Sequence, residues 1–279
     1  MTGLLILLII VLAAVAVPAI SRRRREARRE QLRRKPFPPV WRGILERNVP
    51  LYNHLAPPLK EQLHGLIHIF LAEKNIEGAA GLEVSDEIRV TIAGQACILL
   101  LNRETDYYPR LYSIVVYPHS YEVDKPLFFS GRQHIEATES RLGESWPTGA
   151  VVLAWDHVRQ GAADVHDGHN LVFHEFAHQL DQENASADGI PNLDRISHYI
   201  TWARVVGREY KDLQQHVKSG MASLLDQYGA TNEAEFFAVA TECFFERPAQ
   251  MKAQYPELYA ELKEFYRQDP VTYISCQRA

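Results

Sequence analysis

The sequence contains few cysteines and lacks the short signatures of several common enzyme classes. Only three of the 279 residues are cysteines, Cys97, Cys243 and Cys276, and no two of them form a CxxC pair. Widely spaced cysteines in odd number argue against a disulfide framework and against a cysteine-based zinc site, and they suit a reducing compartment. GxSxG, P-loop and dinucleotide-binding fingerprints are also missing.

Basic residues are scarce over most of the chain. Residues 22–35 hold nine basic and two acidic side chains, whereas residues 36–279 hold 21 basic and 33 acidic ones. The formal net charge of -5 therefore hides a basic segment followed by an acidic body. Such a body argues against direct binding of nucleic acid by the globular part.

Charged side chains are absent from residues 1–21, and residues 3–20 are apolar without interruption. A membrane-spanning helix needs roughly 17–25 such residues. Because the arginines follow this segment and tend to stay in the cytoplasm, we expect an uncleaved single-pass anchor at the inner membrane, with the following domain in the cytoplasm. The alternative is a signal peptide, cleaved after Ala14-Val15-Ala16, with export of the remaining chain.

The pattern of the rest of the chain predicts three segments and an α+β fold. A transmembrane anchor (1–21) precedes a basic juxtamembrane segment with a proline-rich linker (22–40), and one domain follows (41–279). Segments 111–117 and 151–155 are typical of strands, and 88–101 fits a helix or a strand. Apolar spacing predicts helices at 57–71, 171–182, 195–217, 232–246 and 256–267. A small sheet should therefore pack against helices.

The strongest chemical signal is His174-Glu175-Phe176-Ala177-His178. Histidines four apart face the same way on a helix and can bind one zinc ion, whereas Glu175 projects about 100° around the helix and can reach a water beside the metal. This is the division of labour in HExxH metallopeptidases. Asn170 is a suitable N-cap for this helix. The competing interpretation is an ordinary helix with two hydrogen-bonded histidines.

A catalytic zinc site needs a third protein ligand, and the helix predicted at 232–246 offers two carboxylates. Glu235 and Glu242 are seven residues apart and share a similar face of this apolar helix, so either could be the ligand. Glu242 could instead support a ligand or form an ion pair. Asp181 could accept the outer N–H of a ligand histidine, or it could simply be a charged residue near a helix end.

These segments resemble a known family. HEFAHQLD at 174–181, together with YGATNEAEFFA at 228–238, is similar to the Mlc titration factor A family of zinc metallopeptidases, the glucose-regulated peptidases. The resemblance covers most of residues 41–279 and includes the short sequence segments at 167–171 and 265–270. The motif region is also similar to the catalytic domain of anthrax lethal factor.

The resemblance implies a zincin-like domain in which His174, His178 and Glu235 bind one zinc ion per chain. It also implies that Glu175 is the catalytic base, as in the gluzincin arrangement, and that Tyr228 points into the site. The expected activity is that of an aminopeptidase on a peptide or protein substrate. The alternative is a regulatory protein that sequesters a transcriptional repressor. The apolar N-terminus sets this chain apart from the soluble members of the family.

Overall fold

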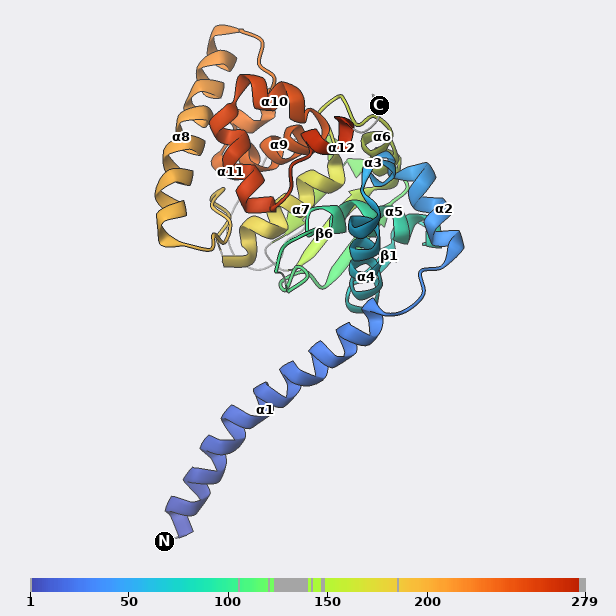
Figure 1. Ribbon diagram of the computed structural model, residues 1–279, viewed down its shortest axis with the longest axis vertical. Helices are drawn as coiled ribbons and strands as arrows, with labels where there is room; N and C mark the ends of the chain where they lie inside the picture. Colours follow the sequence, from blue (N-terminus) through green and yellow to red (C-terminus); the bar gives the residue numbers. More distant parts are fainter. Residues whose placement is uncertain are drawn as a thin grey trace.

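The computed structural model describes residues 2–104, 106–119, 121–122, 140–141, 143–146, 149–184 and 186–275, without the side chains of 2–15, 121–122, 140–141, 143–146 and 274–275. Helix α1 leads into a body with two sides (Figure 1). The sheet and helices α2 to α5 lie on one side, and α8 to α11 lie on the other. Helix α7 runs between them.

Helices make up most of the described chain. They are α1 (Thr2–Arg33), α2 (Pro39–Asn48), α3 (Pro50–His54), α4 (Pro57–Glu73), α5 (Asp86–Ile98), α6 (Trp155–Ala163), α7 (Leu171–Asp181), α8 (Ile196–Ser219), α9 (Glu233–Glu246), α10 (Pro248–Gln254), α11 (Pro256–Tyr266) and α12 (Val271–Ser275), with 3-10 turns η1 (Gln182–Asn184) and η2 (Gln227–Ala230). The strands are β1 (Asn75–Gly78), β2 (Ser113–Tyr117), β3 (Tyr121–Glu122), β4 (Ser140–Arg141), β5 (Gly143–Trp146) and β6 (Ala150–Ala154).

A four-stranded sheet with the order β1-β2-β6-β5 forms the smaller layer. Its first three strands are parallel, with Ser113 of β2 aligned to Asn75 and to Ala150, and β5 runs antiparallel to β6 at one edge. The strands predicted at 111–117 and 151–155 are confirmed as β2 and β6. The α+β class is confirmed as a mostly helical fold with a small, largely parallel sheet.

The segment whose pattern fitted either a helix or a strand is the buried helix α5. Ser85 caps its start, because the Ser85 Oγ accepts the backbone N–H of Ile88 at 3.4 Å. Nearly every residue from Ile88 to Ile98 is buried, so helical spacing alone could not separate the two possibilities. The helices predicted after Asn170 are confirmed as α7, α8, α9 and α11.

The last turns of α1 are fixed to the body through Arg29. This side chain is only 3% exposed, donates to both carboxylate oxygens of Glu73 at 2.8 Å, and contacts Asp106. Its guanidinium lies 4.5 Å from the centre of the Tyr107 ring. Burial alone would lower the pKa of Arg29, but the bonds to Glu73 and Asp106 outweigh burial and raise it. The basic segment is therefore partly a packing element.

The expected membrane anchor is not supported by the structure. Among the residues whose side chains are described, no helix is both long enough and apolar enough to cross a membrane. Most of the apolar segment, residues 1–15, falls outside that description. The anchor, its cytoplasmic orientation and the boundary at residue 41 stay predictions.

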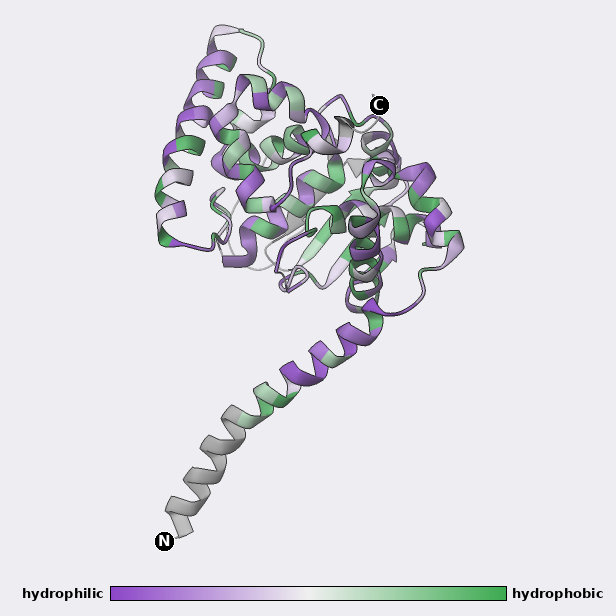
Figure 2. Cartoon of the chain, in the orientation of Figure 1, coloured by the Kyte–Doolittle hydropathy of each residue, from purple (hydrophilic) through white to green (hydrophobic). Residues whose placement is uncertain are grey.

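Helix α9 lies at the centre of the helical side. Its aromatic residues include Phe236, Phe237 and Phe244, all at most 1% exposed, and it packs against α7, α8, α11 and η2. Figure 2 shows hydrophobic residues along α9, whereas hydrophilic residues are more frequent on α8. The packing of α9 against α7 sets the relative position of the side chains that form the site.

Candidate metal centre

Helix α7 carries the two histidines and starts where the sequence predicts. The Asn170 Oδ1 accepts the backbone N–H of Phe173 at 3.0 Å, which confirms the predicted N-cap. His174 and His178 then lie one turn apart on the same face, with ring centres 4.9 Å apart. Both side chains are mostly buried, with 14% and 11% exposed. Burying an imidazole without a polar partner costs free energy, so both rings need hydrogen-bond or metal partners.

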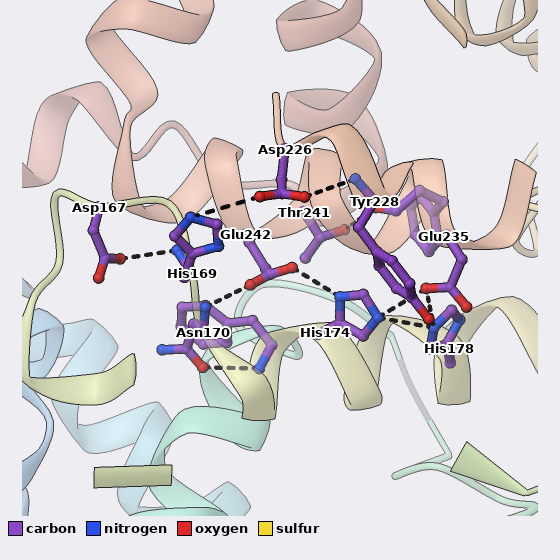
Figure 3. A network of polar contacts seen from close by, with 12 residues as sticks. Asp167, His169, Asn170, His174, His178, Asp226, Tyr228, Glu235, Thr241 and Glu242 are labelled. Atoms are coloured by element: carbon purple, nitrogen blue, oxygen red, sulfur yellow. Dashed lines mark hydrogen bonds and ion pairs between the residues drawn. The ribbon is translucent and has the colours of Figure 1, made fainter. Parts of the chain in front are cut away.

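Helix α9 brings Glu235 to this pair. Asn232 caps α9 by accepting the backbone N–H of Glu235 at 3.0 Å, which places Glu235 in the first turn. Its Oε2 lies 2.9 Å from the Nε2 of His174 and 3.3 Å from the Nε2 of His178 (Figure 3). The two Nε2 atoms are 3.2 Å apart. Three donor atoms thus converge from two packed helices.

The spacing of these atoms fits a tetrahedral zinc ion. Zinc binds imidazole nitrogen and carboxylate oxygen at about 2.0–2.2 Å, so neighbouring ligand atoms of a tetrahedron lie about 3.3–3.6 Å apart. The three separations of 2.9, 3.2 and 3.3 Å need only a small adjustment to reach this value. His174, His178 and Glu235 also form a group whose ligand atoms all lie within 4.8 Å of one another.

Glu242 supports His174 from the opposite side of the ring. Its Oε1 lies 2.8 Å from the Nδ1 of His174, and its Oε2 accepts the backbone N–H of Asn170. A carboxylate on the second nitrogen of a ligand histidine fixes the tautomer and the ring orientation. Of the two carboxylates that the sequence left open, Glu235 is placed for the ligand position and Glu242 for support.

The charges of the group are strongly coupled. Burial alone would raise the pKa of Glu235, but the hydrogen bonds to His174 and His178 lower it to about 2. Burial likewise opposes the charge on His174, yet the bonds to Glu235 and Glu242 raise the pKa of this imidazole well above its ordinary value. This environment stabilises positive charge between the two carboxylates, which is what a cation site requires.

Comparison with known proteins agrees with this geometry. The pattern of the family described as glucose-regulated metallo-peptidase M90 matches residues 21–267. The chain belongs to this family. Among its relatives, an uncharacterized protein of Synechocystis sp. is 38% identical over 250 residues, covering 89% of this chain and 90% of the relative.

Two relatives of this M90 member carry the name Mlc titration factor A. The protein of Klebsiella pneumoniae strain 342 is 31% identical over 230 residues, covering 81% of this chain and 85% of its own length. The protein of Escherichia fergusonii is 30% identical over 237 residues, covering 84% and 87%. The resemblance stated from the two motifs is therefore confirmed, and a metallopeptidase family implies a metal.

Two further residues of this M90 protein were expected in the site. Glu175 follows His174 on α7 and is 4% exposed, and its charge contributes to the raised pKa of His174. Tyr228 lies in η2 with its ring centre 5.9 Å from that of His174 and points toward His174, His178 and Glu235 (Figure 3). Asp226 holds this turn by accepting the backbone N–H of Tyr228 at 2.7 Å. Tyr228 is 51% exposed, so it reaches the site from the solvent side.

Of the two alternatives for Asp181, a bond to a ligand histidine is not formed. Its Oδ2 accepts the backbone N–H of Gly189 at 2.9 Å, and its Oδ1 has no hydrogen-bond partner among the described residues. Burial raises the pKa of Asp181 to about 6. Asp181 therefore anchors the loop after α7 and does not bond to the histidines.

The sequence pattern did not indicate a buried acidic group that lies next to the centre. Glu246 is 1% exposed and accepts the side-chain amide N–H of Asn170 at 3.0 Å. Burial, the nearby charges of Glu242 and Asp167 and a bond to Asp167 raise the pKa of Glu246 to about 9 despite the bond from Asn170. The available signal was its spacing of four residues from Glu242, on the same face of α9.

Proposed function

We propose that this M90 protein is a zinc-dependent peptidase of the aminopeptidase type, with His174, His178 and Glu235 as the ligands of one zinc ion. The observation that carries the proposal is the convergence of three donor atoms, at nearly tetrahedral separations, on two buried helices. The carboxylate of Glu242 behind His174 adds support, because ligand histidines usually bond to such a group.

The remaining chemistry belongs to side chains of the chain itself. When bound, zinc supplies Lewis-acid chemistry that acidifies water and polarises a carbonyl group. In the proposal, Glu175 accepts a proton from the attacking water and later delivers it to the leaving amine. The hydroxyl of Tyr228 donates a hydrogen bond to the negative charge that develops on the carbonyl oxygen. Its position at the solvent side of the ligands suits contact with an incoming substrate.

The sheet edge beside the centre suits an extended peptide. Strand β5 is the outermost strand on its side of the described sheet, and α7 packs against both β5 and β6. An extended peptide can add to an outer strand through main-chain hydrogen bonds, which hold it whatever its side chains are. A substrate bound there would lie next to the helix that carries His174 and Glu175.

The test separates hydrolysis from metal binding. Full-length protein and Glu175→Gln are incubated with peptides that carry either a free or an acetylated N-terminus, and zinc is measured in both proteins. We expect release of the first residue from the free peptide alone, loss of turnover in Glu175→Gln, and unchanged zinc. Glu233→Gln is a matched control, since Glu233 is exposed on the solvent side of α9. Hydrolysis retained by Glu175→Gln would reject the assigned base.

A second candidate function follows from the names of the relatives. Proteins named Mlc titration factor A match most of this chain, so we also consider a regulatory partner such as an Mlc-like repressor. Binding of a regulator does not need Glu175, whereas hydrolysis does. A partner that binds wild type and Glu175→Gln equally, in a protein without peptidase activity, would favour regulation over the proposed enzyme.

A further inference from the structure

A cavity of about 240 Å³ lies beyond the C-terminal end of α7, apart from the metal ligands. Its wall includes Glu183 of η1, Trp202 of α8 and Phe265 of α11, together with Arg103 from the segment that follows α5. Helices α8 and α11 lie side by side at this place (Figure 1). The cavity is smaller than the roughly 300–1,000 Å³ of drug-sized pockets, so its occupant must be a small molecule.

Arg103, a cation in the wall of this cavity, forms no ion pair among the described residues, although the charges of Glu183 and Asp194 favour its charged form. The Arg103 guanidinium lies 4.0 Å from the centre of the Phe265 ring, and its Nη1 is buried without a hydrogen-bond partner among the described residues. Burial lowers the pKa of Arg103 below its ordinary value. Buried polar atoms in proteins are almost always hydrogen-bonded, so an orphaned guanidinium nitrogen at a cavity indicates a missing anionic ligand group.

A carboxylate with the same deficiency lines the same cavity. The Oε1 of Glu183 is buried and has no hydrogen-bond partner in the described part of the chain. Burial raises the pKa of Glu183, and the charge of Arg103 and a hydrogen bond from Asn192 partly counteract this rise. The two orphaned atoms do not bond to each other. The cavity thus presents one unsatisfied donor and one unsatisfied acceptor of opposite charge.

The other charges around the cavity are partly neutralised already. Arg267 pairs with Asp194 at 2.8 Å, and His198 lies 3.1 Å from a carboxylate oxygen of Glu264. Two further acidic side chains, Glu104 and Glu261, also line the cavity. The surplus is therefore acidic, and a ligand with a net negative charge would be repelled.

We propose that this cavity binds a free α-amino acid, with its carboxylate on Arg103 and its ammonium group on Glu183. A zwitterion satisfies both orphaned atoms at once, and Leu193, a partly buried residue of the same wall, offers an apolar contact for the side chain. The acidic surplus favours a neutral or basic side chain over an acidic one. The interaction does not involve the metal ligands, so amino-acid binding is independent of the proposed peptidase activity.

The test is calorimetric titration of the full-length protein with L-leucine, L-lysine and L-glutamate, and with N-acetyl-L-leucine and L-leucinamide. We expect L-leucine and L-lysine to bind, and the three other compounds to bind at least about tenfold more weakly, because each lacks one charged group or adds a repelled one. Binding of L-leucine should persist in Glu235→Ala, which places it away from the metal ligands.

Variants locate the binding in the cavity. Arg103→Met keeps an apolar stem over Phe265, and Glu183→Gln keeps the shape of the carboxylate, so each removes one charge with little change in volume. Both should weaken L-leucine at least about tenfold. Arg267→Met, which removes an already paired arginine of the same wall, should leave affinity unchanged, and circular dichroism confirms folding of each variant. The proposal is overturned if no amino acid binds with a Kd below about 10 mM. It is also overturned if N-acetyl-L-leucine and L-leucinamide bind as tightly as L-leucine, or if both Arg103→Met and Glu183→Gln retain full affinity.

Discussion

Replacing Glu246 with glutamine should stabilise the protein at neutral pH. In the folded state the carboxyl group is buried and its pKa is about 9, against an ordinary value of 4.5. At pH 7 the group is therefore protonated when folded and ionised when unfolded, and taking up this proton opposes folding. Each pH unit between 4.5 and 7 contributes about 1.4 kcal/mol, so the cost at pH 7 is about 3 kcal/mol.

Because the pKa of Glu246 is raised in the folded state, the free energy gained by the substitution depends on pH. A group with a raised folded-state pKa contributes its full stability below about pH 4.5 and loses it as pH rises toward about 9. Glutamine does not titrate, and its amide can accept from Asn170 and donate to Asp167 as the protonated carboxyl does. The advantage of Glu246→Gln should therefore be below about 1 kcal/mol at pH 5 and about 3 kcal/mol at pH 7.

The assay is urea unfolding, followed by tryptophan fluorescence at pH 5, 6, 7 and 8. Glu233→Gln serves as the control, because this exposed carboxylate on the same helix should give a small change at every pH. A Glu246→Gln variant less stable than the wild type at pH 7 and 8 would refute a raised pKa of Glu246 in the folded protein. A difference that did not vary with pH would refute it as well.

Three further substitutions test how the centre is held. Glu242→Gln removes the charge behind His174 and should weaken zinc binding about 10–100-fold without unfolding, as measured by competition with a coloured chelator; unchanged affinity would show that this contact is not needed. Tyr228→Phe should lower kcat about 10²–10³-fold in the peptidase assay with unchanged zinc content, and an unaltered kcat would remove the hydroxyl from the mechanism. Gly189→Ala should lower stability by about 1–3 kcal/mol in thermal unfolding, because Gly189 has a φ of 73° and a Cβ there would lie 2.3 Å from the carbonyl oxygen of Glu233; a Tm equal to that of the wild type would contradict the strain.

Local sequence features predicted the longer helices α4, α7, α8, α9 and α11 and the paired histidines. The spacing of His174 and His178 fixes their common face within one helix, and Asn170 marks its start, so neither depends on the rest of the fold. The same reasoning recovered β2 and β6 from their β-branched residues. Strand β1, with the sequence NIEG, is too short and too polar to give such a signal.

Features that depend on how helices pack could not be read from the chain. Glu235 and Glu242 share a face of α9, and only the way α9 packs against α7 decides which one reaches both histidines. Asp181 has the right spacing for a bond to a histidine, yet its carboxylate accepts the backbone N–H of Gly189 instead. Arg103 and Glu183 are 80 residues apart in the sequence, so no local pattern connects them.

The central claim is that His174, His178 and Glu235 form one zinc site, and the most direct test is elemental analysis of the purified full-length protein. Wild type should contain about one zinc ion per chain, and His174→Ala and Glu235→Ala should contain almost none while remaining folded. Glu233→Ala, two residues from Glu235 and exposed, should keep its zinc. A folded wild-type protein without zinc, or full zinc content in both ligand variants, would contradict the account.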